Sequence, residues 1–250
     1  MCVFSLNAHC QQTIEDFYLS NYKEDGVREW ELKGDEAVIH DRYVDIDKME
    51  ATYFSAEDPI KIKSKRAKLD KENMDVRLEK DVEVKNEEGM KLTTDSLDWQ
   101  RSNNLIETKD WVQAEKESMQ IKAKGLSADT QFKNVDFQKD VQVTFPDQDN
   151  REIITVNCVG PLEIQYNDGT ATFYNNVVME KKEGKLFSDK ATIFFDGEDK
   201  KINKIVSEGN VKIIRDDNIT FAQKATYWGQ DQRLTLEGNP RLVYLYREKE

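Results

Sequence analysis

Short segments in which apolar and charged residues alternate follow one another along almost the whole chain. Met74–Leu78 (MDVRL) and Val82–Lys85 (VEVK) each place apolar side chains on one face and charged side chains on the other. Alternation with a period of two residues is typical of half-buried β-strands, and no stretch of about 10–15 residues shows the period of a helix. Polar turns separate the segments. The pattern therefore predicts an all-β fold made of short antiparallel strands.

The pattern repeats at a regular interval. The leucines Leu69, Leu97 and Leu126 occupy equivalent places in three successive units, 28 and 29 residues apart. A second set of similar elements, Lys-Ala-Thr and Glu-Gly-Asn, occurs twice each, at 190–192, 208–210, 224–226 and 237–239. A unit of this length buries its apolar face only by stacking on its neighbours. We therefore expect an elongated stack of strands rather than a spherical core.

The beginning of the chain predicts a hairpin. Val27–Leu32 alternates between apolar and charged residues, and the Asp-Gly pair within Lys23–Gly26 is a strong turn signal. The segment before the turn also contains several apolar residues. A helix over Thr13–Tyr22 is the alternative there.

Two modules are expected, separated by a segment without alternation. Residues 145–152 (FPDQDNRE) contain Pro, Asp and Asn and no strand pattern. The first six residues, MCVFSL, are apolar but too short for the core of a signal peptide. The expected domains are a disordered or truncated targeting stub at 1–12, a β-module at 13–145, a linker or loop at 146–157 and a second β-module at 158–250.

Composition excludes several classes of function. The net charge is −12 and the pI about 4.9, whereas binding to nucleic acid requires clustered Lys and Arg, so we expect no nucleic-acid partner. Only two His are present, and no signature of a serine hydrolase, P-loop enzyme, zinc protease or dinucleotide enzyme occurs, so no catalytic activity is expected. The three Cys form no CxxC pair, and no metal or cofactor is predicted.

The last part of the chain resembles a known superfamily. Phe221–Tyr227 (FAQKATY) and Gln232–Pro240 (QRLTLEGNP) are similar to the repeat of the OstA-like superfamily, which includes the periplasmic lipopolysaccharide-transport family LptA. Residues 158–250 are therefore identified as an LptA/OstA-like module.

The first part resembles the related LptC family. Gly26 with Trp30–Leu32 (WEL), Lys91–Trp99 (KLTTDSLDW) and Gly125–Asp129 (GLSAD) are similar, in this order, to the motifs of that family. Residues 13–145 are therefore identified as an LptC-like module. LptC-like proteins usually start with a membrane-spanning helix, and no stretch here approaches the roughly 18 apolar residues that such a helix needs.

The resemblance implies a twisted β-jellyroll, an elongated OstA-like stack of short antiparallel strands that is open at both ends. Its function would be that of a periplasmic bridge protein that shields the lipid A acyl chains of lipopolysaccharide in an apolar groove, between the inner and the outer membrane. Implied partners are an inner-membrane ABC transporter complex at the N-terminal edge and another OstA-like module or the outer-membrane translocon at the C-terminal edge. The implied location is the periplasm, tethered to the inner membrane by a segment outside this chain.

The alternating phase selects the side chains that would line this groove. In the first module they are Val76, Val82, Val84, Leu92, Leu97, Ile121, Leu126, Phe137, Val141 and Val143. In the second they are Ile164, Phe173, Phe187, Ile193, Phe195, Val211, Ile213, Phe221, Tyr227, Leu234 and Leu236. Alternation shows which side chains share a face, but not whether that face admits a ligand. A structural β-solenoid-like scaffold or adhesin fragment without lipid cargo, with a closed core, is therefore the alternative function.

Overall fold

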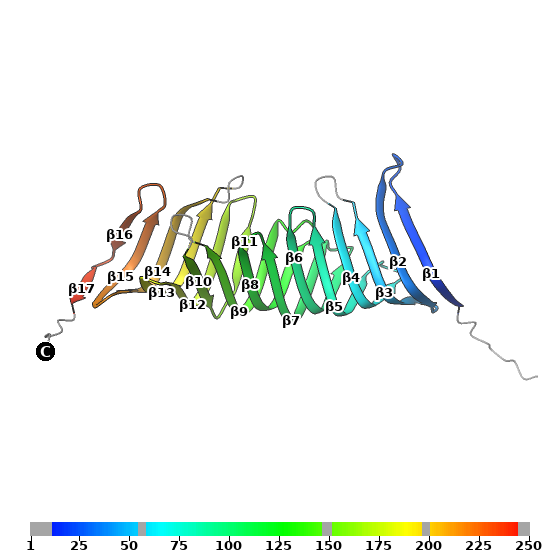
Figure 1. Cartoon of the computed structure of the whole chain (residues 1–250), viewed down its shortest axis with the longest axis horizontal. Helices are drawn as coiled ribbons and strands as arrows, with labels where there is room; N and C mark the ends of the chain where they lie inside the picture. Colours follow the sequence, from blue (N-terminus) through cyan, green and yellow to red (C-terminus); the bar gives the residue numbers. More distant parts are fainter. Residues whose placement is uncertain (1–11, 55–58, 147–151, 197–200, 245–250) are drawn as a thin grey trace, which may run out of the picture. The chain divides into compact units, whose positions relative to one another are not determined.

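The chain is an all-β protein, as predicted. A computed structural model describes residues 12–54, 59–146, 152–196 and 201–244. Within these residues it contains seventeen β-strands and no helix (Figure 1). Most of the strands are 11–14 residues long, about twice the usual length in globular proteins.

Two compact units make up the chain, and each is described by itself. The first consists of Met1–Glu88 and Thr93–Asn103, and the second of Gly89–Leu92 and Asn104–Glu250, so the division falls within β6 (Met90–Gln100). The first unit otherwise contains β1 (Gln12–Tyr22), β2 (Arg28–Ile39), β3 (Tyr43–Tyr53), β4 (Ile60–Asp70) and β5 (Val76–Asn86). The second contains β7 (Leu105–Lys116), β8 (Met119–Asp129), β9 (Asn134–Pro146), β10 (Ile153–Cys158), β11 (Leu162–Gln165), β12 (Thr170–Lys181), β13 (Gly184–Phe195), β14 (Ile202–Arg215), β15 (Asn218–Trp228), β16 (Arg233–Glu237) and β17 (Arg241–Tyr244).

In the first unit, each strand from β1 to β5 pairs antiparallel with the next. The hairpin expected at the start is present, because β1 and β2 pair from Gln12 and Ile39 to Tyr22 and Arg28. At its turn, the Gly26 N–H donates a hydrogen bond to the Lys23 carbonyl at 2.9 Å. The alternative helix before this turn is wrong, since the residues form β1.

In the second unit, two pairs of short strands each occupy the place of one long strand. β7, β8 and β9 pair in sequence, and β9 then pairs with both β10 and β11. Both short strands pair with β12 on their other side. β12 to β15 pair in sequence, and β15 pairs with both β16 and β17. All of these pairings are antiparallel, as the hydrophobic pattern predicts.

The segment expected to be a linker at 146–157 contains a strand. Residues 147–151 lie outside the described residues, as do residues 1–11 of the expected targeting stub. Ile153–Cys158 form β10 and pair with Val141–Pro146 of β9. The expected loop is wrong over this part, because the β-branched run Ile153-Ile154-Thr155-Val156 has a high strand propensity and finds a partner in β9.

Many of the strands bend near their middle. At Asp81 (φ 51°), Asp140 (φ 51°), Asn176 (φ 54°) and Gly209 (φ 75°), the backbone is left-handed and the register to a neighbouring strand shifts. A bulge of this kind bends its strand, and Gly, Asn and Asp adopt a positive φ most readily. Each bent strand therefore has two arms, one on either side of its bulge.

The arms of neighbouring strands pair to form two layers in each unit. Layer 2A of the second unit holds 134–139 of β9, β11 and 170–174 of β12, whereas layer 2B holds 141–146 of β9, β10 and 177–181 of β12. In the first unit, layer 1A holds 43–47 of β3, 66–70 of β4 and 76–79 of β5. Layer 1B holds 49–53, 60–64 and 82–86 of the same strands.

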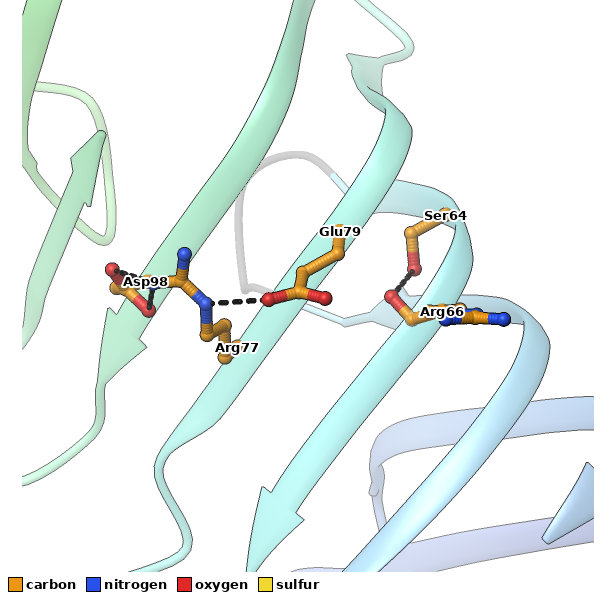
Figure 2. A network of polar contacts seen from close by, with 5 residues as sticks. All are labelled: Ser64, Arg66, Arg77, Glu79 and Asp98. Carbon is orange, nitrogen blue, oxygen red and sulfur yellow. Dashed lines mark hydrogen bonds and ion pairs between the residues drawn. The ribbon is translucent and has the colours of Figure 1, made fainter. Parts of the chain in front are cut away.

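Polar contacts stabilise the bend of the first unit. The Lys48 Nζ lies 2.5 Å from Asp35 Oδ2, and Lys65 forms an ion pair with Asp81. In β4, the Ser64 hydroxyl donates a hydrogen bond of 2.9 Å to the Arg66 carbonyl, at the point where the register shifts (Figure 2). The bend is thus held by side chains within the strands themselves.

Buried apolar side chains form rows that cross the strands. Ile46, Ala67 and Leu78 are direct neighbours on β3, β4 and β5, and Phe137 and Leu162 are neighbours on β9 and β11. All five are at most 4% exposed. The alternation found in the sequence therefore becomes one apolar face on each layer.

Gly34 of β2 tests how tightly the first unit is packed. A Cβ at this position would lie 2.8 Å from the ring of the facing Phe17 and 3.0 Å from Ile46. We expect Gly34→Ala to destabilise the protein by about 1–3 kcal/mol, the usual cost of overpacking, measured by denaturant unfolding. In a Phe17→Ala background the same change should cost much less. An equal cost in both backgrounds would contradict the proposed contact.

Candidate functional site

An apolar cavity of about 290 Å³ lies in the second unit. It is bounded on two sides by different layers. Layer 2B and the arm of β8 paired with it contribute Ile121, Val143 and Phe145. Layer 2A and the arm of β13 paired with it contribute Ile164, Phe173, Ile193 and Phe195. Since both layers line one cavity, their apolar faces are turned toward each other across it.

A small residue helps to leave this space open. Ile164, Ala171 and Ile193 are direct neighbours on β11, β12 and β13, and all three line the cavity. Ala171 is the smallest side chain of the row. The cavity is therefore a consequence of the side-chain sizes in layer 2A as well as of the bend.

Polar and amphipathic groups line part of the cavity wall. Lys116, Glu117 and Ser118 lie at the turn between β7 and β8. Tyr166 follows β11, and its ring centroid lies 6.2 Å from that of Phe195 in an edge-on arrangement. An apolar cavity with a few polar groups suits an amphipathic ligand whose apolar part enters and whose polar part stays near water.

Two larger hollows elsewhere are more open and are lined mostly by charged residues. One of about 620 Å³ in the second unit is lined largely by 180–185 (EKKEGK), and one of about 470 Å³ in the first unit by Arg42, Lys68, Asp70 and Asp98, among others. Size alone would favour these hollows. Their charged side chains favour water over an apolar ligand, so the smaller apolar cavity is the better candidate.

The structure brings six of the predicted groove residues together around the cavity. They are Ile121, Val143, Ile164, Phe173, Ile193 and Phe195. Further predicted residues are buried in the strands, namely Val82, Val84, Leu92, Leu97, Leu126, Phe137, Val141 and Val211. Half-buried ones are Val76, Ile213, Tyr227 and Leu236, and Leu234 near the C-terminal end is 47% exposed. That these side chains contact lipid stays a prediction.

Two predicted residues, Phe187 and Phe221, lie on the outer face of their strands, opposite to the face that lines the interior. Phe187 is the direct neighbour of Lys212, which is itself the direct neighbour of Phe221, and the Lys212 Nζ lies 5.7 Å from the centroid of the Phe187 ring. The inward residue of this arm is Ser188, which is 5% exposed. Unbroken alternation would place Phe187 on the same face as Ile193, because the two residues are six positions apart. The register shift between Phe187 and Lys190 reverses that phase.

Sequence reasoning missed several residues of the cavity wall, namely Met119, Phe145, Pro146, Leu162, Tyr166, Ala171 and Ile202. Leu162 shares the phase of the predicted Ile164 and was detectable from alternation. Tyr166 continues the same phase just after β11 and was detectable in the same way, whereas Ile202 begins its strand and no alternation precedes it. Ala171 could be assigned to the cavity wall only once the pairing of β11, β12 and β13 showed that it lies between Ile164 and Ile193.

Burial affects the one cysteine in the described residues. Cys158 is 6% exposed, and its neighbour on β9 is the buried Val141. Burial raises the pKa of its thiol to about 11, so the thiol is protonated and a poor nucleophile at neutral pH. It contributes packing to the interior rather than chemistry.

The described part of the chain shows no metal site and no membrane-spanning helix. Across 12–54, 59–146, 152–196 and 201–244, no cluster of three or more His, Cys, Asp or Glu could hold a metal ion. None of these residues belongs to a helix long and apolar enough to cross a membrane.

Two family models match the chain, one after the other. Residues 5–146 match the family described as lipopolysaccharide-assembly, LptC-related, and residues 161–249 match the LptA/(LptD N-terminal domain) LPS transport protein family. The first match covers more than half of the chain. The comparison with curated proteins found no match.

The two matched segments meet inside the second unit through strand pairing. β9 ends the first match and β11 begins the second, and the two strands pair from Leu162 and Phe137 to Gln165 and Asn134. The cavity is lined by both segments, with Ile121 and Val143 from the first and Ile164 and Phe173 from the second. The candidate site therefore lies where the two segments join.

A pair of carboxylates faces solvent at this junction. Asp136 and Glu163 are direct neighbours on β9 and β11, and Glu163 accepts a hydrogen bond of 3.0 Å from the Tyr174 hydroxyl. Partial loss of hydration and then the facing Glu163 raise the pKa of Asp136. An acid with a raised folded-state pKa favours folding below its unfolded-state pKa, and this contribution is lost as the pH rises through the folded-state pKa.

Asp136→Asn should therefore stabilise the protein at neutral pH. We expect a gain of about 0.2–1 kcal/mol, the range of cross-strand pair effects, that vanishes below about pH 3, where the Asp is protonated in both states. Unfolding in urea at several pH values measures the difference between variant and parent. Gln138→Glu, on an exposed residue two positions along the same strand, is a control that adds a charge outside the pair. A gain for Asp136→Asn that is independent of pH would contradict the assignment.

Proposed function

The chain belongs to the LptC-related family of lipopolysaccharide-assembly proteins and carries an LptA/LptD-like transport module after the LptC-like one; from this premise, we propose that it shields the acyl chains of lipopolysaccharide in its apolar interior. A role in lipopolysaccharide transport follows from the family, whose members are periplasmic bridge components. The proposal adds where in this chain the lipid is held.

The observation that carries the proposal is the apolar cavity between layers 2A and 2B. A purely structural β-stack would gain stability by filling this space, because empty volume in a core is destabilising. The cavity instead has apolar walls, with polar groups along one side. This arrangement favours the carrier over the alternative of a scaffold or adhesin fragment without cargo.

The net charge of −12 is compatible with an anionic lipid if only the acyl chains enter. The cavity walls are mainly apolar, and Lys116 and Glu117 lie at the turn that borders them. Phosphates and sugars would then stay in solvent. Isolated core sugars should accordingly compete poorly with whole lipopolysaccharide for the protein.

The ends of the described chain suggest where partners attach. Near the C-terminal end, Leu242 and Tyr244 of β17 are 68% and 67% exposed. Near the N-terminal end, Tyr18 and Leu19 of β1 are 55% and 51% exposed. Exposed apolar residues on terminal strands favour the addition of further strands. From the family resemblance, we propose that the inner-membrane ABC transporter complex binds the β1 end, and another OstA-like module or the outer-membrane translocon the β17 end.

Adjacent phenylalanines allow a matched crosslinking test. Phe195 lines the cavity, whereas Phe194 lies in the opposite phase, with the Lys204 Nζ 4.1 Å from its ring centroid. A benzophenone amino acid at Phe195 should form adducts with the acyl chains of lipopolysaccharide on irradiation, detected by gel shift and mass spectrometry. The same group at Phe194 should form few or none. Equal adducts at both positions, or adducts only at Phe194, would contradict an internal site.

A change that fills the cavity should block binding. Ala171→Phe places a ring in the space beside Ile164 and Ile193, and we expect it to reduce lipopolysaccharide binding at least tenfold, measured by equilibrium titration. Thr170→Phe, one residue away in the opposite phase, is the control and should bind normally. Unchanged binding by a folded Ala171→Phe protein would place the lipid elsewhere.

A further inference from the structure

Two aromatic rings meet inside the first unit. The ring of Tyr53, at the end of β3, lies 6.1 Å from that of Trp99 in β6, measured between centroids, with an angle of 79° between the planes. Each shares the phase of a buried apolar residue two or four positions away, Met49 for Tyr53 and Leu97 for Trp99. Both rings are therefore on the inner side.

The two rings come from opposite layers. The Asp98 carboxylate accepts two hydrogen bonds of 2.7 and 2.8 Å from the Arg77 Nη1, which places the end of β6 beside layer 1A (Figure 2). Arg77 is the neighbour of Lys68, and Lys68 is the neighbour of Asp45 in β3. Asp45 and Tyr53 are eight residues apart, roughly 26 Å along an extended strand. Trp99 reaches Tyr53 only because layers 1A and 1B fold over one another.

A second contact joins the same two ends. The Arg101 Nη2 lies 3.8 Å from Glu29 Oε1, and the other Glu29 oxygen accepts a hydrogen bond of 2.7 Å from Asn21. Glu29 adjoins Trp30, which is the neighbour of Tyr53 in β3. We name the four residues Trp99, Tyr53, Arg101 and Glu29 the clasp.

The closed clasp leaves one polar atom unsatisfied. The indole Nε1 of Trp99 is buried and has no hydrogen-bond partner. A buried N–H without a partner costs free energy that is regained when water reaches it. The long, half-exposed ion pair between Arg101 and Glu29 contributes little. The clasp therefore combines a favourable contact between two rings with a weak ion pair and an unsatisfied N–H, so that closing it gains less free energy than burial of the two rings alone would give.

We propose that the clasp is a gate that closes the interior of the first unit and opens to admit acyl chains. Behind it lie the buried residues Leu78, Val82 and Val84, together with the half-buried Ile62 beside Val84. This inference rests on the proposed lipid-carrying function. It adds that the first unit must open before lipid contacts its interior, whereas the second unit already has a cavity.

The test compares lipid access to the two units in one protein. A benzophenone amino acid at Ile62 reports on the first unit, and one at Phe195 reports on the second. With lipopolysaccharide vesicles, Trp99→Ala should raise the yield of adducts at Ile62 at least fivefold and leave the yield at Phe195 unchanged. Trp111→Ala, which removes a Trp that is 58% exposed, is the matched control and should change neither yield.

A charge swap tests whether the ion pair of the clasp controls access to the first unit. Arg101→Glu should raise the yield at Ile62, because two carboxylates then face each other, and the double variant Glu29→Arg with Arg101→Glu should restore the parental yield. Rescue would show that the contact between these two side chains, and not the loss of either one, sets the yield at Ile62. Equal yields at Ile62 in the parent and in Trp99→Ala, with adducts present at Phe195, would overturn the gate.

A measurement without lipid separates the gate from the carrier function. If no adduct forms at Phe195, the proposed function fails, and the gate is judged by the apolar dye anilinonaphthalene sulfonate. Trp99→Ala should then bind more dye than the parent and Trp111→Ala, at an unchanged far-UV circular dichroism spectrum. A folded Trp99→Ala protein with parental dye binding would overturn the gate as well.

Discussion

The bulge near the middle of the strands is the constraint on which the rest of the structure depends. A straight strand with one apolar face would leave that face in water. Bending at residues such as Asp140 and Gly209 folds each strand into two arms, so that the apolar face of one arm is turned toward that of the other. The bulge also reverses the alternating phase, so Ser188 and Ala191, three residues apart, are both buried. One local backbone feature thus creates the interior and selects the side chains that line it.

The two units use this interior differently. In the second unit, Ala171 lies between two isoleucines and a cavity of about 290 Å³ is left between the layers. In the first unit, Trp99 and Tyr53 meet across the gap. Because the cavity is lined by both family segments, an acyl chain held there would already contact the LptA/LptD-like segment while touching the LptC-like one. Both segments belong to one polypeptide, and the pairing of β9 with β11 joins them within one chain rather than in an encounter between two proteins.

Alternation was sufficient to predict the fold class and most of the inner face, since a strand that buries one side must place apolar residues at every second position. It failed at Phe187 and Phe221, because a bulge reverses the phase and leaves no mark that alternation alone detects. It also missed β10, whose β-branched residues follow a polar, Pro-containing stretch. The cavity and the contact between Trp99 and Tyr53 depend on how closely two arms fold together. No pattern within a single strand encodes the distance between the arms.

The most direct test of the central claim is a solution NMR measurement on the protein with selectively labelled isoleucine methyl groups and bound lipopolysaccharide. Nuclear Overhauser effects from the acyl-chain protons should reach the methyl groups of Ile121, Ile164 and Ile193, which line the cavity from both family segments. The methyl group of Ile153, 59% exposed, should show none. Effects at Ile153 without any at the three cavity isoleucines would show that the lipid binds outside, and that the interior is not a groove.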